Sequence, residues 1–377
     1  KHFPGDGVDE RDQHLVTSSN DLSCEEWDAT FGEAYRASID AGALTVMIGH
    51  IMQPAYSRRL CPGIKDEDIM PATLAPELIQ GLLREKLGFN GLIVTDATTM
   101  AGFAIPMPRS KAVPYTIAVF LFTKNLEEDY EYMSAGVEDG TITPERLDEA
   151  VVRILGLKAA LKLPEKKADG SIFVKSEEAG KIVGCEEHKR IELECADQAV
   201  TLVKDTQKLL PINIARHKRV LIYPILSGES AFGGGGEDVA GIVKEALEKE
   251  GFAVDVFQAS QGYEGMQRRY QDTVEQYDLM IYVGNMATKS NQTTVRIEWA
   301  QPMGADCPIY QSVIPTIFIS FANPYHLLDV PRIRTYINAY KFKESNINAV
   351  IDKLLGRSEF KGITPVDPFC GRWDAKM

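Results

Sequence analysis

The stretch Gly91-Leu92-Ile93-Val94-Thr95-Asp96 decides the fold class of this chain. Its continuous apolar run is typical of a strand buried on both faces, as in parallel sheets flanked by helices. The run ends in a carboxylate, and in α/β barrels the catalytic side chains stand at the carboxyl ends of the strands. Aspartate is also a common helix N-cap, so the pattern alone allows either a catalytic or a capping role for Asp96.

Helices and strands alternate before this stretch. Ser23 can cap a helix over residues 24–42, a second buried run occupies 44–50, and Pro76 begins an amphipathic helix that Gly88 ends. Polar residues recur at the expected strand ends, namely Lys1, His2, His50 and Asp96. This β-α-β-α-β order predicts a parallel α/β barrel.

The connection between the next predicted helix and strand, within residues 110–123, is irregular. A short helix over 110–118 would pass directly into a strand over 119–123. A helix-to-strand connection normally needs at least ~2 residues, often with a glycine after the helix. We therefore expect that a few residues are missing between Ala118 and Val119.

A long helix closes the first half of the chain. Thr143 and Pro144 predict its start and Leu163 its end. Its apolar residues, expected to face inward, are Leu147, Val151, Ile154, Leu155 and Leu161. The charged segment 164–185 is expected to be a linker between a first domain over 1–163 and a second over 186–377.

The second domain is expected to be an α/β sandwich. Strands are predicted by apolar runs at 201–203, 220–223, 279–283, 316–320 and 335–339, alternating with helices such as 238–250 and 347–355. Gly233–Gly236 could hold a phosphate at a helix N-terminus. The stretch lacks the lysine of a P-loop and the spacing of a dinucleotide turn, so a plain turn is favoured.

Composition excludes several classes of partner and cofactor. The net charge of −13 argues against nucleic acid, and no apolar run is long enough to cross a membrane. The six cysteines are far apart, which indicates reduced thiols, a cytoplasmic location and no metal site. No cofactor is expected, and the sequence does not indicate an oligomeric state.

Three motifs occur in a fixed order along the chain. They are Lys1-His2-Phe3-Pro4-Gly5-Asp6-Gly7, then Asp12-Gln13-His14, then the run from Leu87 to Ala97 with Met100. Together they resemble glycoside hydrolase family 3, in particular its β-N-acetylglucosaminidase branch. The resemblance covers essentially all 377 residues. Asp6 is a departure, because many members have histidine at that position.

The resemblance implies a retaining exo-β-N-acetylglucosaminidase that cleaves terminal β-linked GlcNAc from muropeptide-type or chitin-type saccharides by double displacement. It implies that Asp96 is the nucleophile and that His14, held by Asp12, is the acid/base. Histidine suits this role because it exchanges protons near neutral pH. Lys1 and His2 would bind sugar hydroxyls, and no metal or cofactor would be needed.

Two alternatives keep the same residues. Phosphate could replace water as the acceptor, or the chain could be a non-catalytic remnant that binds sugar. The resemblance also implies that this chain begins at the fifth strand of an eight-stranded barrel. We therefore expect the second half of a (β/α)8 barrel, with about 150–200 further residues before Lys1.

Overall fold

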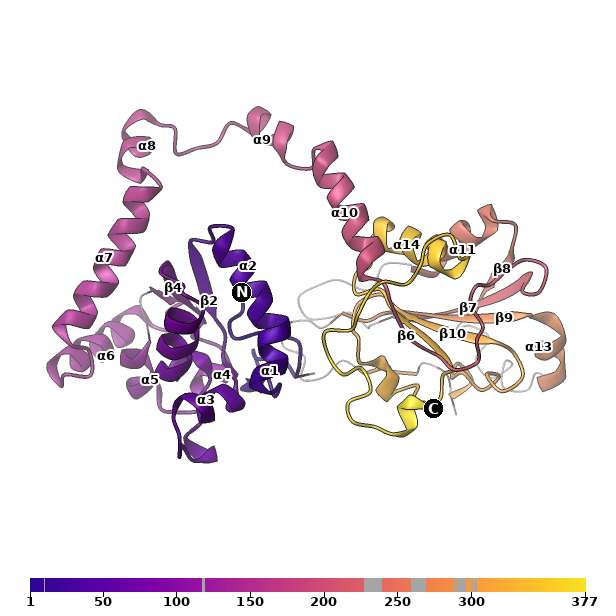
Figure 1. Ribbon diagram of the computed structural model, residues 1–377, viewed down its shortest axis with the longest axis horizontal. Coiled ribbons are helices and arrows are strands. Elements are labelled where there is room, and N and C mark those ends of the chain that lie inside the picture. The colour runs from indigo at the N-terminus through magenta and orange to yellow at the C-terminus, as the bar shows by residue number, and fades with distance from the viewer. Residues whose placement is uncertain are drawn as a thin grey trace. The chain divides into compact units, whose positions relative to one another are not determined.

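The computed structural model describes residues 1–9, 11–116, 119–226, 239–258, 269–287, 290, 296–299, 301 and 304–377. The chain divides into two compact units. Unit 1 contains Lys1–Ser176 and Lys289–Thr294, and unit 2 contains Glu177–Thr288 and Val295–Met377. Each is an α/β unit, with a parallel sheet in unit 1 and a mostly parallel sheet in unit 2 (Figure 1). Ala118, next to the expected gap in the chain, and the turn Gly233–Gly236 lie outside the described residues.

The sheet of unit 1 confirms the strands that the apolar runs predict. Its strands β2 (Thr45–Ile48), β4 (Leu92–Ala97) and β5 (Val119–Leu121) are parallel and lie in the order β2-β4-β5. Phe3 pairs with Ile48 in parallel, which adds the first residues beside β2. A separate two-stranded ladder joins β1 (Ser18–Ser19) to β3 (Ile51–Met52). This order is consistent with a barrel-type domain, and the half-barrel stays a prediction.

The helices of unit 1 begin largely where the sequence predicts. Ser23 and Glu26 form a reciprocal capping box at the start of α1. The helical segments are α1 (Cys24–Trp27), η1 (Asp28–Gly32), α2 (Glu33–Asp40), α3 (Pro54–Leu60), η2 (Asp66–Asp68), η3 (Ala72–Leu74), η4 (Leu78–Lys86), α4 (Ala101–Ala104), α5 (Arg109–Tyr115), α6 (Leu126–Glu138), α7 (Pro144–Ala160) and α8 (Leu163–Asp169). Helix α9 (Ser176–Ile182) follows and falls almost entirely in unit 2.

An aromatic cluster fixes the first residues of the chain. Phe3 packs edge-on against Trp27 and Tyr35, and the Trp27 indole donates a 2.7 Å hydrogen bond to the Pro4 carbonyl. Gly5 follows with a φ of +131°, and a Cβ there would lie 2.3 Å from the Phe31 ring. Only glycine fits this position, because both the backbone conformation and the contact exclude a side chain.

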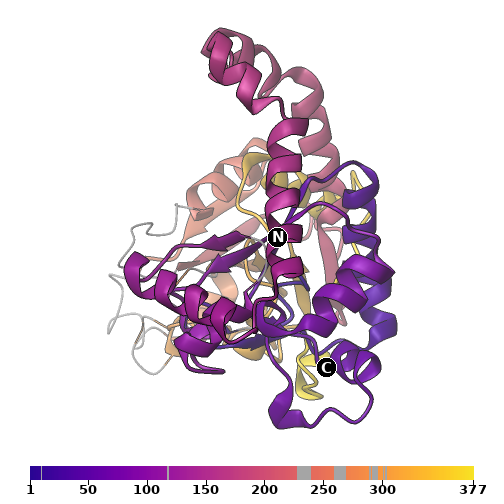
Figure 2. The same cartoon turned by 90° about the vertical axis from the view of Figure 1, so that its left-hand side faces the viewer.

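Helix α7 departs from the predicted packing. Leu147, Val151, Leu155 and Leu161 were expected to face inward but are 38% to 57% exposed. Ile154, the fifth of the predicted residues, is partly buried. The expectation was wrong for the other four because an apolar stripe is buried only where another element covers it, and the described segments cover this one only in part. In both views the C-terminal part of α7 and α8 extend beyond the rest of unit 1 (Figures 1 and 2). The segment 164–185, expected to be a linker, contains the short helices α8 and α9.

Unit 2 is built on a six-stranded sheet in the order β6-β11-β10-β9-β7-β8. The strands are β6 (Thr201–Asp205), β7 (Arg219–Leu226), β8 (Ala253–Val256), β9 (Leu279–Asn285), β10 (Thr316–Ser320) and β11 (Thr335–Asn338). Only β6 is antiparallel to its neighbour. The five predicted strands are present, and β8 was not predicted.

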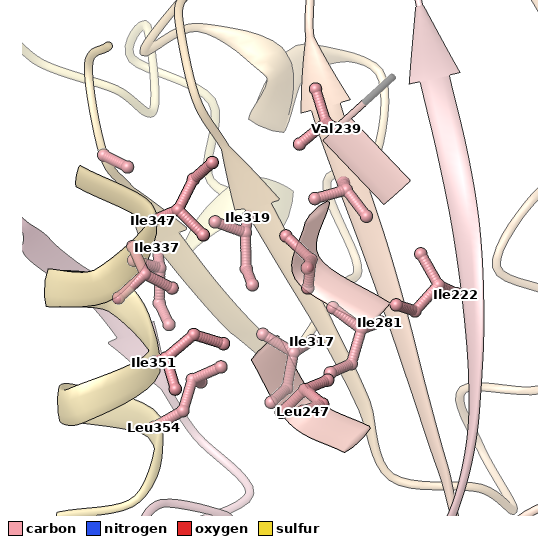
Figure 3. Packing of buried hydrophobic residues seen from close by; sticks show 14 of the residues in the cluster. Ile222, Val239, Leu247, Ile281, Ile317, Ile319, Ile337, Ile347, Ile351 and Leu354 are labelled. Atoms are coloured by element: carbon pink, nitrogen blue, oxygen red, sulfur yellow. The ribbon is translucent and has the colours of Figure 1, made fainter. Parts of the chain in front are cut away.

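Helices cover the sheet of unit 2. After α9, the described α-helices of unit 2 are α10 (Glu186–Ala199), α11 (Val239–Lys249), α13 (Tyr270–Gln276) and α14 (Glu344–Leu354). Two single turns, η7 (His326–Leu328) and η8 (Asp374–Lys376), are also described. Figure 3 shows α11 and α14 placing Leu247, Ile351 and their neighbours against the aliphatic face of the central strands. No helix in the described part of the chain is long and apolar enough to cross a membrane.

Candidate active site

Asp96 lies near the end of the central strand β4, where the buried run meets the surface. Its Oδ1 accepts a 2.8 Å hydrogen bond from the main-chain N–H of Ala97. The capping role that the sequence left open does not apply, since the next helix, α4, begins at Ala101 and has Met100 at its N-cap. The carboxylate is therefore placed to act at the strand end.

His2 bridges two carboxylates at this strand end. Its Nε2 lies 3.5 Å from Asp96 Oδ2, and its Nδ1 lies 3.5 Å from Asp6 Oδ2. Burial lowers the pKa of His2 even though both carboxylates act to raise it. The ring is therefore neutral at neutral pH and can present one donor and one acceptor. Lys1, the other predicted sugar-binding residue, is exposed beside it.

Asp12 and His14 form a close pair. Asp12 Oδ1 lies 2.6 Å from His14 Nδ1 and accepts a second hydrogen bond, of 2.9 Å, from the His14 main-chain N–H. A carboxylate accepts here, so Nδ1 carries the proton and Nε2 is left to face other groups. In this structure Nε2 lies 3.2 Å from the Ser290 hydroxyl, which also belongs to unit 1.

His50 packs against the end of strand β4 and contacts the residue after Asp96. Its ring is completely buried, with Nδ1 2.8 Å from Thr73 Oγ1 and Nε2 3.0 Å from the Ala97 carbonyl. Burial lowers the pKa of His50, so the ring is neutral. A carbonyl can only accept, which means that Nε2 carries the proton. The one hydroxyl proton of Thr73 lies between two acceptors, His50 Nδ1 and the Gly49 carbonyl, each 2.8 Å away. His50 is thus a satisfied, packed side chain that fixes the residue after Asp96.

Three of the five predicted site residues lie near His50. Asp96, His14 and His2 are all close enough for their charges to act on the protonation of His50. The main-chain carbonyl of His14 also accepts a 3.0 Å hydrogen bond from Ala101 N–H, which ties its loop to the segment behind Asp96. The strand end therefore combines a carboxylate with an aspartate-held imidazole.

Two residues of this site were not predicted from the sequence. Gln13 is only 3% exposed and joins Asp6 to His50, although it is the unspecified middle residue of the D-x-H motif. Ser290 lies 276 positions from His14 in the chain. Neither residue belongs to a pattern that indicates a function. Each joins the site only through contacts with residues that folding brings close.

Among the described residues, a cavity of unit 1 reaches the site only through Thr73, the partner of His50. The cavity, of about 420 Å³, is lined by residues from η4, α5, α6 and α7, such as Ile79, Tyr115, Met133 and Leu147, and by none of the predicted site residues. No group of three or more His, Cys, Asp and Glu side chains in the described residues is placed to hold a metal ion.

Comparison with known proteins places the chain in a family. The sequence model of the "Glycosyl hydrolase family 3 N terminal domain" matches residues 1–157. A protein of Cellulomonas fimi, "Beta-N-acetylglucosaminidase/beta-glucosidase", is 51% identical over 384 residues, covering 100% of this chain and 67% of that protein. The chain therefore belongs to glycoside hydrolase family 3.

Solved structures agree with this assignment. "Beta-glucoside phosphorylase BglX" is 46% identical with a TM-score of 0.79, over 100% of this chain and 66% of that one. A family 3 β-N-acetylglucosaminidase from Paenibacillus sp. str. FPU-7 is 22% identical with a TM-score of 0.64, covering 98% of this chain and 66% of that one, which shows the shared fold. The chain thus spans about two thirds of the length of these relatives.

Proposed function

We propose that this chain carries the nucleophile and the acid/base of a retaining exo-β-N-acetylglucosaminidase. The observation that carries the proposal is the 2.6 Å contact between Asp12 and His14, on a loop tied to the segment behind Asp96. Retaining glycosidases need one group to attack the sugar and another to exchange a proton with the glycosidic oxygen. Asp96 and His14 supply these two groups, and Asp12 orients the imidazole.

The reaction proceeds in two displacements. Asp96 attacks the anomeric carbon, the bond to the glycosidic oxygen breaks, and protonated His14 gives the proton on Nε2 to the departing oxygen. Water then attacks the anomeric carbon and gives a proton to Nε2, while the bond between Asp96 and the sugar breaks. His2 and Lys1 are assigned to the sugar hydroxyls and orient the ring.

The substrate class follows from the branch that the three motifs resemble. We assign terminal β-linked GlcNAc on muropeptide-type or chitin-type saccharides to this site. The Cellulomonas relative is named for both β-N-acetylglucosaminidase and β-glucosidase activity, so β-glucosides are the natural comparison substrates.

A second candidate is transfer of the same sugar to phosphate. It is favoured by the 46% identical structure, which is titled a β-glucoside phosphorylase. A neutral or cationic imidazole also repels an anionic acceptor less than a carboxylate acid/base would. Phosphate would attack the anomeric carbon in the second displacement, and the product would be a sugar 1-phosphate.

One experiment separates these functions. The protein is given aryl β-GlcNAc and aryl β-glucoside, each with and without inorganic phosphate, and the products are followed by NMR. Hydrolysis with retained β-configuration and no need for phosphate supports the glycosidase. A phosphate-dependent sugar 1-phosphate supports the phosphorylase, and binding of sugar without turnover supports a non-catalytic remnant.

A further inference from the structure

Gln13 is the most buried residue of the loop that carries Asp12 and His14. Its exposed fraction is 3%, whereas the side chains of Asp12 and His14 are 12% and 38% exposed. A glutamine buried on a loop needs hydrogen-bond partners for both ends of its amide, because an unpaired buried amide is costly. The fold provides both partners at the strand ends.

The amide of Gln13 spans the ends of two neighbouring strand segments. Its Nε2 donates a 2.8 Å hydrogen bond to Asp6 Oδ2, just after the segment that pairs with β2. Its Oε1 accepts a 3.0 Å hydrogen bond from the main-chain N–H of His50, just after β2. One side chain thus ties the loop to both segments.

The main chain of the loop is held on its other side by the segment after β4. Ala101 N–H donates to the His14 carbonyl at 3.0 Å. The Gln13 carbonyl lies so close to Gly102 that a Cβ on that glycine would be 2.5 Å from it. The side chain of Gln13 therefore fixes the loop toward Asp6 and His50, and its backbone fixes it toward the segment behind Asp96.

We propose that Gln13 is the positioning residue that holds His14 in its working place relative to Asp96. The amide links the Asp12–His14 pair, through Asp6 and the His50 main chain, to the segment that carries His2 and to the end of β2. The ring of His50 in turn contacts the Ala97 carbonyl, next to Asp96. This inference rests on the proposed function, since it assigns Gln13 a task in proton transfer by His14. Gln13 does not touch the reacting atoms.

Removing the Gln13 amide should leave the His14 imidazole present but no longer held in position. Gln13→Ala should lower kcat/KM by about 10-fold or more on a β-glycoside with an alkyl or sugar leaving group, because small displacements of a catalytic group cost up to ~100-fold. On a dinitrophenyl glycoside, whose departure needs no proton, the loss should stay below about 3-fold. With that substrate and added azide, the variant should form a glycosyl azide, since azide needs no general base.

Exchanging the amide and the carboxylate between positions 13 and 6 should rescue the activity lost in Gln13→Glu. Gln13→Glu places a carboxylate against Asp6, so its activity on the poor leaving group should fall relative to wild type at neutral pH and recover as the pH is lowered and the pair shares a proton. The double variant Gln13→Glu/Asp6→Asn restores a donor–acceptor pair with the roles reversed. It should regain most of the lost activity at neutral pH.

Gln53→Ala is the matched control. Gln53 is also completely buried in unit 1, donates to the Leu22 carbonyl at 2.8 Å and accepts from Tyr56 N–H at 2.6 Å. Its loss should lower the melting temperature but leave the ratio of rates on the two leaving groups unchanged. Equal losses on both substrates for Gln13→Ala would overturn the inference. So would a double variant Gln13→Glu/Asp6→Asn that is no more active than Gln13→Glu. If His14→Ala itself shows no dependence on leaving group, the proposed function fails instead.

Discussion

The buried ring of His50 donates a 3.0 Å hydrogen bond from Nε2 to the carbonyl of Ala97, the residue next to Asp96. The main-chain N–H of His50 donates a 3.0 Å hydrogen bond to Gln13 Oε1, on the loop of His14. One residue thus contacts the backbone beside Asp96 and the loop beside His14.

His14→Ala should separate substrates by their leaving groups. We expect a loss of roughly 10²- to 10⁴-fold on alkyl or sugar leaving groups, the usual contribution of general acid–base catalysis. Activated aryl glycosides should be much less affected, and Asp12→Ala should show the same pattern more mildly. Steady-state kinetics on both substrate types provide the measurement, and equal losses on the two would contradict the acid/base assignment.

Asp96 should be the residue that bonds to the sugar. A 2-fluoro-sugar inactivator should label this carboxylate, and Asp96→Ala should abolish turnover, since no covalent intermediate can then form. Peptide mass spectrometry locates the label. A label on another residue, such as Asp6, or an inverted product would show that the nucleophile is misassigned.

Gly102→Ala should displace the loop of His14. The new Cβ would lie 2.5 Å from the Gln13 carbonyl and 3.0 Å from His50 Cβ, so the loop must move. We expect a loss of about 10- to 100-fold on poor leaving groups and a destabilisation of about 1–3 kcal/mol. Gly156→Ala in α7 is the control, because nothing lies within 4 Å of its Cβ position. It should be fully active and slightly more stable, and similar kinetics for the two variants would argue against the close contact.

His326 should make unit 2 sensitive to acid. Burial lowers the pKa of His326 from 6.5 to about 4, against the opposing effect of Asp329. Asp329 Oδ2 lies 4.0 Å from His326 Nδ1, and Asp329 Oδ1 is paired with Arg296. Between these pH values the unfolded chain binds a proton that the folded chain does not. The free energy of unfolding should therefore fall as the pH drops from 6.5 towards 4, by up to about 3 kcal/mol from this residue.

His326→Leu should flatten that part of the stability profile, as measured by denaturant unfolding of the protein at a series of pH values. His188, which is exposed on α10, provides the control. His188→Gln should keep the wild-type slope. An unchanged slope in His326→Leu would show that other groups cause the acid sensitivity.

The sequence was most informative where local signals and tertiary packing agree. The strands around 44–50 and 91–96 could be predicted because their apolar runs are continuous, and the helix after Ser23 because serine is a good N-cap. Strand β8 was missed because it is short and mostly solvent-facing, with only Val254 buried. Periodicity predicts which residues share a face, but it does not say whether that face is covered, as α7 shows.

The site shows the same limit at the level of single residues. Asp96, Asp12 and His14 belong to recognisable motifs, so their residue types and spacing point to their chemistry. Gln13 gains its role only because folding brings Asp6 and His50 to either side of it. Ser290 meets His14 across 276 positions of chain. No local pattern encodes such contacts.

The N–H of Ala97 makes the two oxygens of Asp96 unequal. Oδ1 accepts that hydrogen bond at 2.8 Å, whereas Oδ2 faces His2 Nε2 at 3.5 Å. In the proposed reaction, an ester formed through Oδ2 leaves Oδ1 as its carbonyl oxygen, still polarised by the same amide dipole. That polarisation makes the carboxylate a better leaving group when the sugar departs. The side chain can therefore serve as nucleophile and as nucleofuge without rotating between the two halves of the cycle.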